Sequence, residues 1–107
     1  MTRVLPLVLM LAGCQAASGT PAEAAKACAR VHAGADKVSA NKARAVVAVC
    51  KLELDRWALS SIERRYGKSL QTSDPKMMAE YRDTRRALDE MFLLELSDEI
   101  KLTHYRL

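Results

Sequence analysis

The stretch that decides the fold is residues 47–67, VAVCKLELDRWALSSIERRYG. Apolar side chains recur in it every three or four residues, at Val47, Cys50, Leu54, Ala58 and Ile62. This spacing places them on one face of an α-helix. Gly67 comes next, and glycine is typical just past a helix C-terminus. The pattern predicts a long helix that is capped by Asp36 or Ser39 and ends near Tyr66.

Two further helices are indicated, one on each side. Thr20-Pro21-Ala22-Glu23 is a capping-box pattern with proline at the first helical position, so a helix should run from there to about Val31. Asp74-Pro75 repeats the cap-and-proline signal. No glycine or proline follows Pro75, so this helix is expected to run close to Ile100 or beyond. Its predicted buried stripe is Met78, Tyr81, Leu88, Phe92 and Leu96, widened by Met91, Leu93 and Leu94.

The second and third predicted helices are expected to form an antiparallel hairpin. If their turn is centred near residues 70 and 71, Lys51 faces Glu90 and Asp55 faces Arg86. Opposite charges at both positions favour this register, although exposed ion pairs contribute only about 0–1 kcal/mol each. No segment has strand chemistry, so the expected fold class is all-α, a small three-helix bundle of helical hairpins.

The N-terminus has the features of an export signal. Arg3 is followed by an apolar run over residues 4–12, about half the length needed for a transmembrane helix. The run ends in Leu11-Ala12-Gly13-Cys14, which resembles the lipobox of bacterial lipoproteins. The resemblance implies cleavage before Cys14, a diacylglyceryl group on its sulfur and an acyl chain such as palmitate on its nitrogen.

The resemblance also implies a domain organisation and an address. Residues 1–13 would be the signal peptide, residues 14–19 the lipidated cysteine with a short tether, and residues 20–107 a helical periplasmic domain. In such lipoproteins an Asp after the cysteine marks retention in the inner membrane, and this chain has Gln15. We therefore expect a lipid anchor in the outer membrane, facing the periplasm, or in the cell membrane of a Gram-positive cell.

The three cysteines divide into one that takes lipid and one pair. Cys28 and Cys50 are equally far from Ser39, which lies in the best candidate turn, residues 32–40. Antiparallel helices joined there bring the two thiols together, and disulfides persist in oxidising compartments. A zinc site of Cys28, His32, Cys50 and His104 is the first alternative, and unpaired buried thiols are the second. The export signal and the absence of a CxxC motif favour the disulfide.

The chain offers little for catalysis. It contains two histidines, His32 and His104, far apart in the sequence, and no recognisable nucleophile motif or glycine-rich phosphate loop. We expect a protein that is not an enzyme, with no metal, no cofactor besides the lipid and no small-molecule substrate.

The chain has a formal net charge of +4, and its charged residues are unevenly distributed along the sequence. Basic residues gather around the predicted second turn: Arg64, Arg65, Lys68, Arg82, Arg85 and Arg86. They form a candidate patch for an acidic envelope protein, anionic lipid or peptidoglycan. The alternative is an ordinary solvated surface. Nucleic acid is an unsuitable partner for a lipidated periplasmic protein.

These features favour a non-enzymatic binding or assembly factor. In size, anchor and helical content it is similar to pilotins, which escort secretin subunits, and to the exclusion lipoproteins of conjugative plasmids. A pilotin-like groove would lie at the edge formed by Met77, Met78, Met91 and Phe92, because methionine suits adaptable surfaces. The alternatives are a periplasmic inhibitor of a cell-wall-degrading enzyme such as lysozyme, and a purely structural envelope lipoprotein. The loop at 68–73 is basic to neutral, which counts against an inhibitor.

Overall fold

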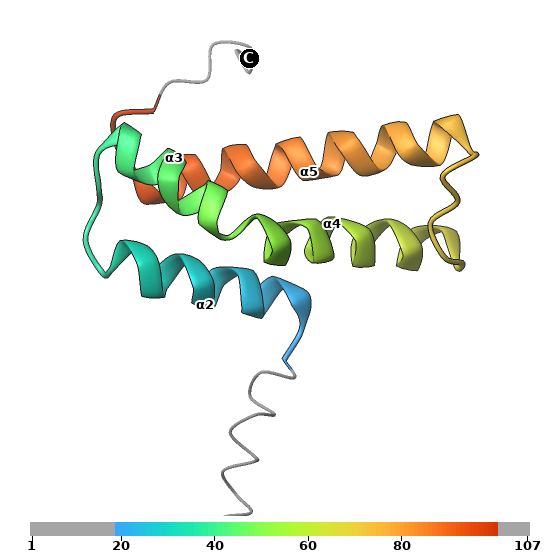
Figure 1. The fold of residues 1–107 in the computed structure, drawn as a ribbon, viewed down its shortest axis with the longest axis horizontal. Coiled ribbons are helices and arrows are strands. Elements are labelled where there is room, and N and C mark those ends of the chain that lie inside the picture. The colour runs from blue at the N-terminus through green and yellow to red at the C-terminus, as the bar shows by residue number, and fades with distance from the viewer. Residues whose placement is uncertain (1–18, 101–107) are drawn as a thin grey trace, which may run out of the picture.

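The structure is a computed structural model that describes residues 19–100, and it is all-α over this range (Figure 1). Its helices are α2 (Pro21–Ala33), α3 (Ala40–Val49), α4 (Lys51–Tyr66) and α5 (Pro75–Leu96). The predicted signal, Cys14, most of the tether and His104 lie outside the described residues. No helix within residues 19–100 has the length and hydrophobicity needed to cross a membrane.

The predicted start of α2 is confirmed. The Thr20 hydroxyl oxygen accepts a hydrogen bond from the Glu23 N–H at 3.1 Å, and Pro21 is the first helical residue. The helix continues two residues past the predicted Val31. It is capped by Gly34, whose φ of 83° is rarely adopted by residues that have a Cβ atom.

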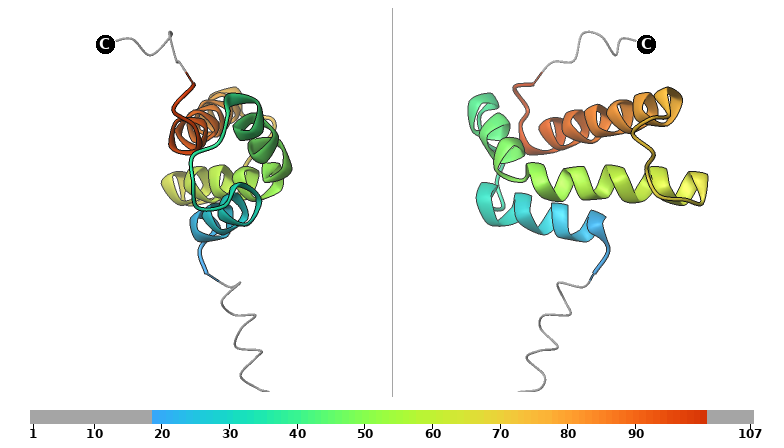
Figure 2. Two further views of the ribbon diagram at one scale, coloured as in Figure 1. Left: turned by 90° about the vertical axis from the view of Figure 1, so that its left-hand side faces the viewer. Right: turned by 45° about the vertical axis from the view of Figure 1, so that its right-hand side comes forward.

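The predicted second helix is divided in two at Cys50, so the bundle has four helices within the described range instead of three. Ser39 caps α3, accepting from the Lys42 N–H at 3.1 Å. At Cys50 the backbone leaves helical geometry, with φ −94° and ψ 19°, and α3 is inclined steeply to α4 (Figure 2, right). No glycine or proline marks this bend. It coincides with the residue that is bonded to α2, so tertiary structure sets it.

The disulfide between Cys28 and Cys50 is present, with their Cα atoms 5.9 Å apart. It joins the middle of α2 to the bend between α3 and α4. The prediction of the pair from its symmetry about Ser39 is confirmed. With both sulfurs bonded to each other, neither is available as a zinc thiolate, so the four-residue zinc site is wrong for this state of the protein.

The hairpin of α4 and α5 is also confirmed. The Asp74 carboxylate caps α5, accepting from the Lys76 and Met77 N–H groups, both at 3.1 Å. In α4, Gly67 provides a left-handed C-cap with φ 71°, as predicted. Both helices extend past the N-terminal end of α2, so one end of the hairpin consists of two helices (Figure 1).

The end of α5 differs from its prediction. The helix stops at Leu96 and Ser97 is extended and buried, whereas the prediction placed the end near Ile100. The α2–α3 loop, residues 34–39, binds this end. Its Val38 N–H donates to the Leu96 carbonyl at 2.9 Å, and its Lys37 ammonium donates to the Glu95 carbonyl at 2.7 Å. Carbonyls that a longer helix would use internally are thus satisfied by the loop.

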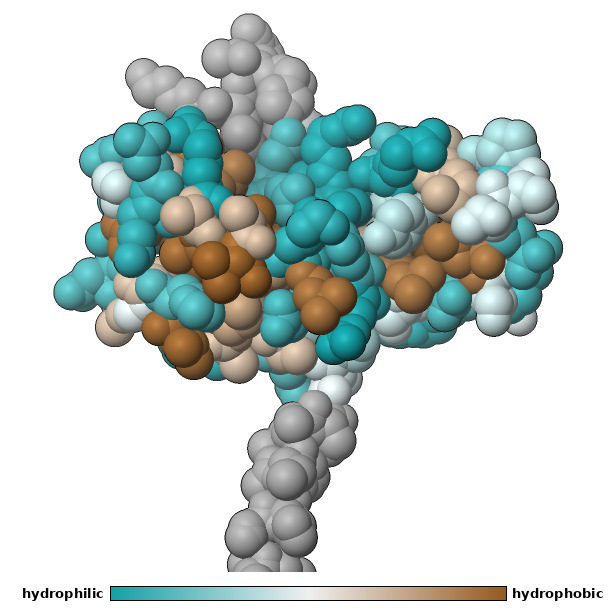
Figure 3. Space-filling model, viewed as in Figure 1, coloured by the Kyte–Doolittle hydropathy of each residue, from teal (hydrophilic) through white to brown (hydrophobic). Residues whose placement is uncertain are grey.

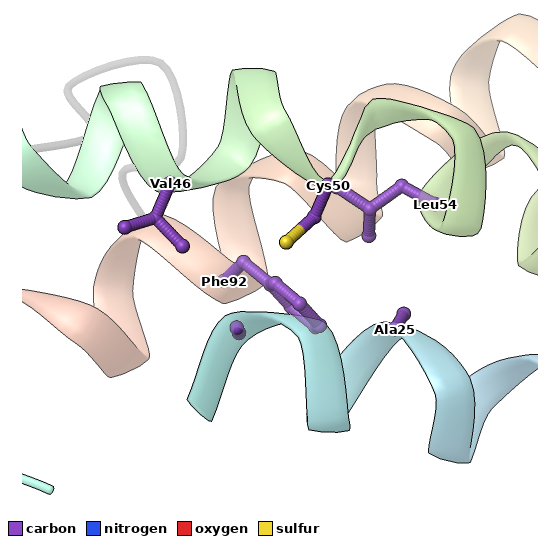
Figure 4. Close-up of a cluster of buried hydrophobic side chains, with 6 residues drawn as sticks. Ala25, Val46, Cys50, Leu54 and Phe92 are labelled. Atoms are coloured by element: carbon purple, nitrogen blue, oxygen red, sulfur yellow. The ribbon is translucent and has the colours of Figure 1, made fainter. Parts of the chain in front are cut away.

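The core lies where α2, the α3–α4 bend and the end of α5 meet. The ring of Phe92 lies between α2 and the bend (Figure 4), and Trp57 packs edge-on against it with ring centroids 6.1 Å apart. The buried cluster consists of Ala25, Ala29, Val46, Cys50, Leu54 and Phe92. Alanines on α2 bring that helix close to its neighbours.

The predicted stripes are confirmed more fully on α4 than on α5. Cys50, Leu54, Ala58 and Ile62 are fully buried. On α5, Met77 is the fully buried methionine and Met78 is half-buried, the reverse of the predicted stripe. Leu94 is 46% exposed, so its assignment to the buried face is wrong.

Reducing the Cys28–Cys50 bond should lower the free energy of unfolding by about 3 kcal/mol, because a cross-link over this separation restricts the unfolded chain. The measurement is urea unfolding followed by Trp57 fluorescence, with and without reductant, in a chain carrying Cys14→Ser. A second chain that also carries Cys28→Ala and Cys50→Ala is the control, and reductant should not move its midpoint. An unchanged midpoint in the first chain would show that the bond does not stabilise the fold.

Candidate functional site

The predicted basic patch separates into two parts. Arg82, Arg85 and Arg86 line an open groove of about 590 Å³ between α4 and α5. The groove is completed by Lys51, Asp55, Tyr81 and Asp89. Arg64, Arg65 and Lys68 lie outside it, at the end of α4 and in the following loop. Sequence reasoning did not include Lys51 in the patch, because Lys51 is distant in sequence from the turn.

Arg85 is the centre of an ion-pair network. Its Nε atom donates to Asp55 Oδ1 at 2.6 Å, and its Nη1 atom donates to Asp89 Oδ1. Lys51 Nζ donates to the second oxygen of Asp55 at 3.0 Å. The predicted cross-hairpin pairing of Asp55 is therefore wrong by one residue, since it faces Arg85 instead of Arg86. The predicted antiparallel arrangement still holds.

The network shifts the pKa values of its members. Burial raises the pKa of Asp55, but hydrogen bonds from Lys51 and Arg85 outweigh this effect and hold it below its usual range. Burial lowers the pKa of Arg85, while the bonds to Asp55 and Asp89 raise it by more. Both groups therefore stay charged. With its side chain only 15% exposed and two carboxylates bound, Arg85 positions α4 against α5 and offers little charge to a partner.

The exposed surface of the groove is formed by arginines that are less tightly bound than Arg85. Arg82 is exposed, and within residues 19–100 it forms no ion pair. Arg86 is 64% exposed and has a long ion pair of 3.5 Å with Asp83. Burial, followed by the charge of Asp55, raises the pKa of Tyr81, so its hydroxyl remains a neutral hydrogen-bonding group. Together with Lys51 these side chains give the groove a positive surface for carboxylates or phosphates.

The tip of the hairpin is the end of α4 with the loop that follows it, and two of its three predicted patch cations have local partners. Arg65 pairs with Glu80 at 3.1 Å, and Arg64 donates to the Ser60 hydroxyl at 3.3 Å. Lys68 is exposed in the loop. Exposed pairs of this kind contribute at most about 1 kcal/mol, so the tip remains accessible to an acidic surface.

The predicted methionine edge exposes little apolar surface. Met77 and Phe92 are buried in the protein, at 0% and 2% exposure, and Met78 and Met91 are half-buried. Met77 is further fixed by the loop, since its sulfur accepts from the Gln71 N–H at 3.4 Å. On the face seen in Figure 3, hydrophobic residues form separate patches between hydrophilic ones. This face therefore has no continuous apolar track for a partner helix.

A second hollow was not predicted. It lies between the C-terminal half of α2, the α2–α3 loop and the end of α5, and its volume is about 300 Å³. Its lining includes Lys26, Ala29, Arg30, Lys37, Phe92 and Leu96. The sequence contained one signal for it, the i, i+4 spacing of Lys26 and Arg30. The bend and the loop that complete the hollow could not be predicted.

Metal binding finds no support in the described part of the chain. Among residues 19–100 there is no group of three or more His, Cys, Asp or Glu side chains able to hold a metal ion. His32 is exposed near the C-terminus of α2, where a positive charge interacts favourably with the helix dipole.

Substituting Asp55→Asn should lower the free energy of unfolding of the protein. It should also make this free energy less dependent on pH in the acidic range. The folded-state pKa of Asp55 is below its unfolded value of about 3.9, so its contribution is complete above that pH and is lost as the pH falls through the folded pKa. At pH 7 the substitution should cost roughly 1–3 kcal/mol. The measurement is urea unfolding between pH 2 and pH 7.

The control is Asp83→Asn, because Asp83 is 73% exposed and its bond to Arg86 is long. This variant should keep the acid dependence of the parent chain. If Asp55→Asn also keeps it, the Arg85 network does not stabilise the hairpin.

Comparison with known proteins gives no relative of this chain. No family model, no curated protein and no solved structure matches it. Its function is therefore inferred from its own cysteines, charges and hollows.

Proposed function

We propose that this protein is a lipid-anchored binding module that acts outside the cytoplasm and catalyses no reaction. The Cys28–Cys50 disulfide is the observation that carries the proposal. It accounts for two of the three cysteines and is of a kind that persists in oxidising compartments. The remaining cysteine, Cys14, stands at the end of the lipobox-like Leu11-Ala12-Gly13-Cys14.

The proposed anchor restricts where the domain acts. Lipid on Cys14 would hold the chain firmly, since each buried methylene contributes about 0.8 kcal/mol. A tether over residues 14–19 spans at most about 20 Å. The helical domain would therefore stay close to the membrane, and Gln15 favours the periplasmic face of the outer membrane. In a Gram-positive cell the same anchor would place the domain on the cell membrane.

The groove between α4 and α5 supports binding as the activity. Lys51, Arg82 and Arg86 stand on two helices whose mutual position is fixed by the Arg85 network. Such a rigid, positively charged surface suits an acidic segment of an envelope protein, and association would be accelerated by charge complementarity. An assembly factor that positions such a partner, in the manner of a pilotin, fits this surface better than it fits the buried methionines.

Intact mass of the membrane-extracted protein tests the anchor. The full chain, expressed in a Gram-negative host, should lose residues 1–13, gain diacylglyceryl and acyl groups at Cys14, and lack the two thiol hydrogens of Cys28 and Cys50. The variant Cys14→Ser should keep residues 1–13 and the disulfide but carry no lipid. An unprocessed parent chain without lipid would contradict the proposal.

Crosslinking in membranes tests the groove. A photoreactive residue in place of Asp83, beside the groove, should capture an acidic envelope protein. Arg82→Glu combined with Arg86→Glu should reduce the captured product by more than about tenfold, because like charges across an interface cost several kcal/mol. Lys42→Glu combined with Arg44→Glu, both exposed on α3, is the matched control and should leave capture unchanged. Equal capture after charge reversal in the groove would contradict this binding site.

A further inference from the structure

The hollow beside α2 has the features of a ligand site. Its volume of about 300 Å³ is within the range of small-molecule pockets. Its lining includes Ala29 and Phe92, which belong to the buried cluster, and Leu96, which packs against that cluster. A ligand in this position would therefore add apolar contacts directly to the core. The α2–α3 loop, which forms one wall, runs from α2 past the end of α5 (Figure 2, left).

Cations occupy the α2 wall. Lys26 and Arg30 are one helical turn apart and so share a face of α2. Lys26 lies over the ring of Trp57, with its Nζ 5.8 Å from the ring centroid. Arg30 is exposed and forms no ion pair with any carboxylate in the described part of the chain. An anion at this wall would thus meet a guanidinium that is not already neutralised.

On the opposite wall, which the α2–α3 loop and the end of α5 form, positive and negative charges are more nearly balanced. Lys37 is held by its hydrogen bond to the Glu95 carbonyl, and the acidic residues Asp36 and Glu95 also line the hollow. The anionic end of a ligand is therefore favoured on the α2 side, and its apolar end is favoured against Phe92 and Leu96.

We propose that this hollow binds a medium-length alkyl chain that carries one anionic head group, a carboxylate or a phosphate. Arg30 and Lys26 hold the head through charge-assisted hydrogen bonds. The partly exposed Leu96 contacts the chain, and the nearly buried Ala29 and Phe92 close the hollow beneath it. At about 30 Å³ per non-hydrogen atom, the volume accommodates roughly ten such atoms, the size of octanoate. The inference does not depend on the lipid at Cys14 or on the α4–α5 groove.

Trp57 provides a specific readout, because the chain contains one tryptophan. Its ring contacts Phe92 on one side and Lys26 on another, and both of these residues line the hollow. A ligand that orders Lys26 or packs on Phe92 changes the surroundings of the indole. Its emission should therefore change saturably during a titration.

The test is a titration of octanoate, below its micelle concentration, into the full chain carrying Cys14→Ser, followed by Trp57 emission and by calorimetry. We expect saturable binding and a rise in Tm with ligand concentration. Arg30→Gln should weaken binding by on the order of tenfold or more, through loss of a charge-assisted hydrogen bond. Arg64→Gln makes the same charge change at the other end of the molecule and should leave the affinity unchanged.

The ligand series identifies the head group. Binding of octanoate supports a free fatty acid as the source, and binding of octyl phosphate supports a lipid head group; either supports the site if Arg30→Gln weakens it. Equal affinity for 1-octanol would overturn the proposal, because the head would then contribute nothing. Association with phosphatidylglycerol vesicles in the absence of octanoate or octyl phosphate binding would also overturn it, since a membrane surface would then be the ligand. Unchanged affinity in Arg30→Gln would have the same consequence.

Discussion

The bond between Cys28 and Cys50 is the constraint on which the arrangement of the described helices depends. It fixes α2 to the chain at the point where α3 and α4 meet. The buried face of α2 consists of Ala25 and Ala29, whose methyl groups each contribute about 0.8 kcal/mol on burial. A cross-link worth about 3 kcal/mol exceeds the contribution of both methyl groups together. The covalent bond therefore adds substantially to the stability of a bundle in which this alanine-rich helix buries little apolar surface.

The same bond organises the second hollow. Cys28 lies between Lys26 and Arg30 on α2, so the segment that carries both cations is attached at its centre. The floor at Phe92 belongs to the cluster that surrounds Cys50. Fixing α2 therefore fixes the wall of the hollow relative to its floor. A site built in this way is pre-organised, which reduces the ordering cost of binding.

Features that depend on neighbouring residues could be predicted from the sequence. The caps at Thr20, Ser39 and Asp74 are short-range hydrogen bonds; residue type and spacing identified Thr20 and Asp74 and left Ser39 as one of two candidates with Asp36. The bend at Cys50 and the end of α5 at Leu96 could not be predicted, because contacts with distant segments set them. For the same reason the basic residues were recognised as a group, while their division into a structural Arg85 and accessible neighbours was not. Choosing Arg85 over Arg86 requires knowing the helix rotation, which one residue changes by about 100°.

The two charged sites differ in what their arginines do. Arg85 is enclosed by Asp55 and Asp89, and removing either carboxylate would leave a half-buried charge that is costly to accommodate. Arg30 is exposed beside an apolar floor and has its charge available for a ligand. Arg30 is nine residues from the start of α2, or about 14 Å along the helix. The hollow therefore lies away from the start of α2, whereas the α4–α5 hairpin extends past that start (Figure 1). The hollow and the α4–α5 groove share no lining residue, so one small domain presents two separate surfaces that carry cations.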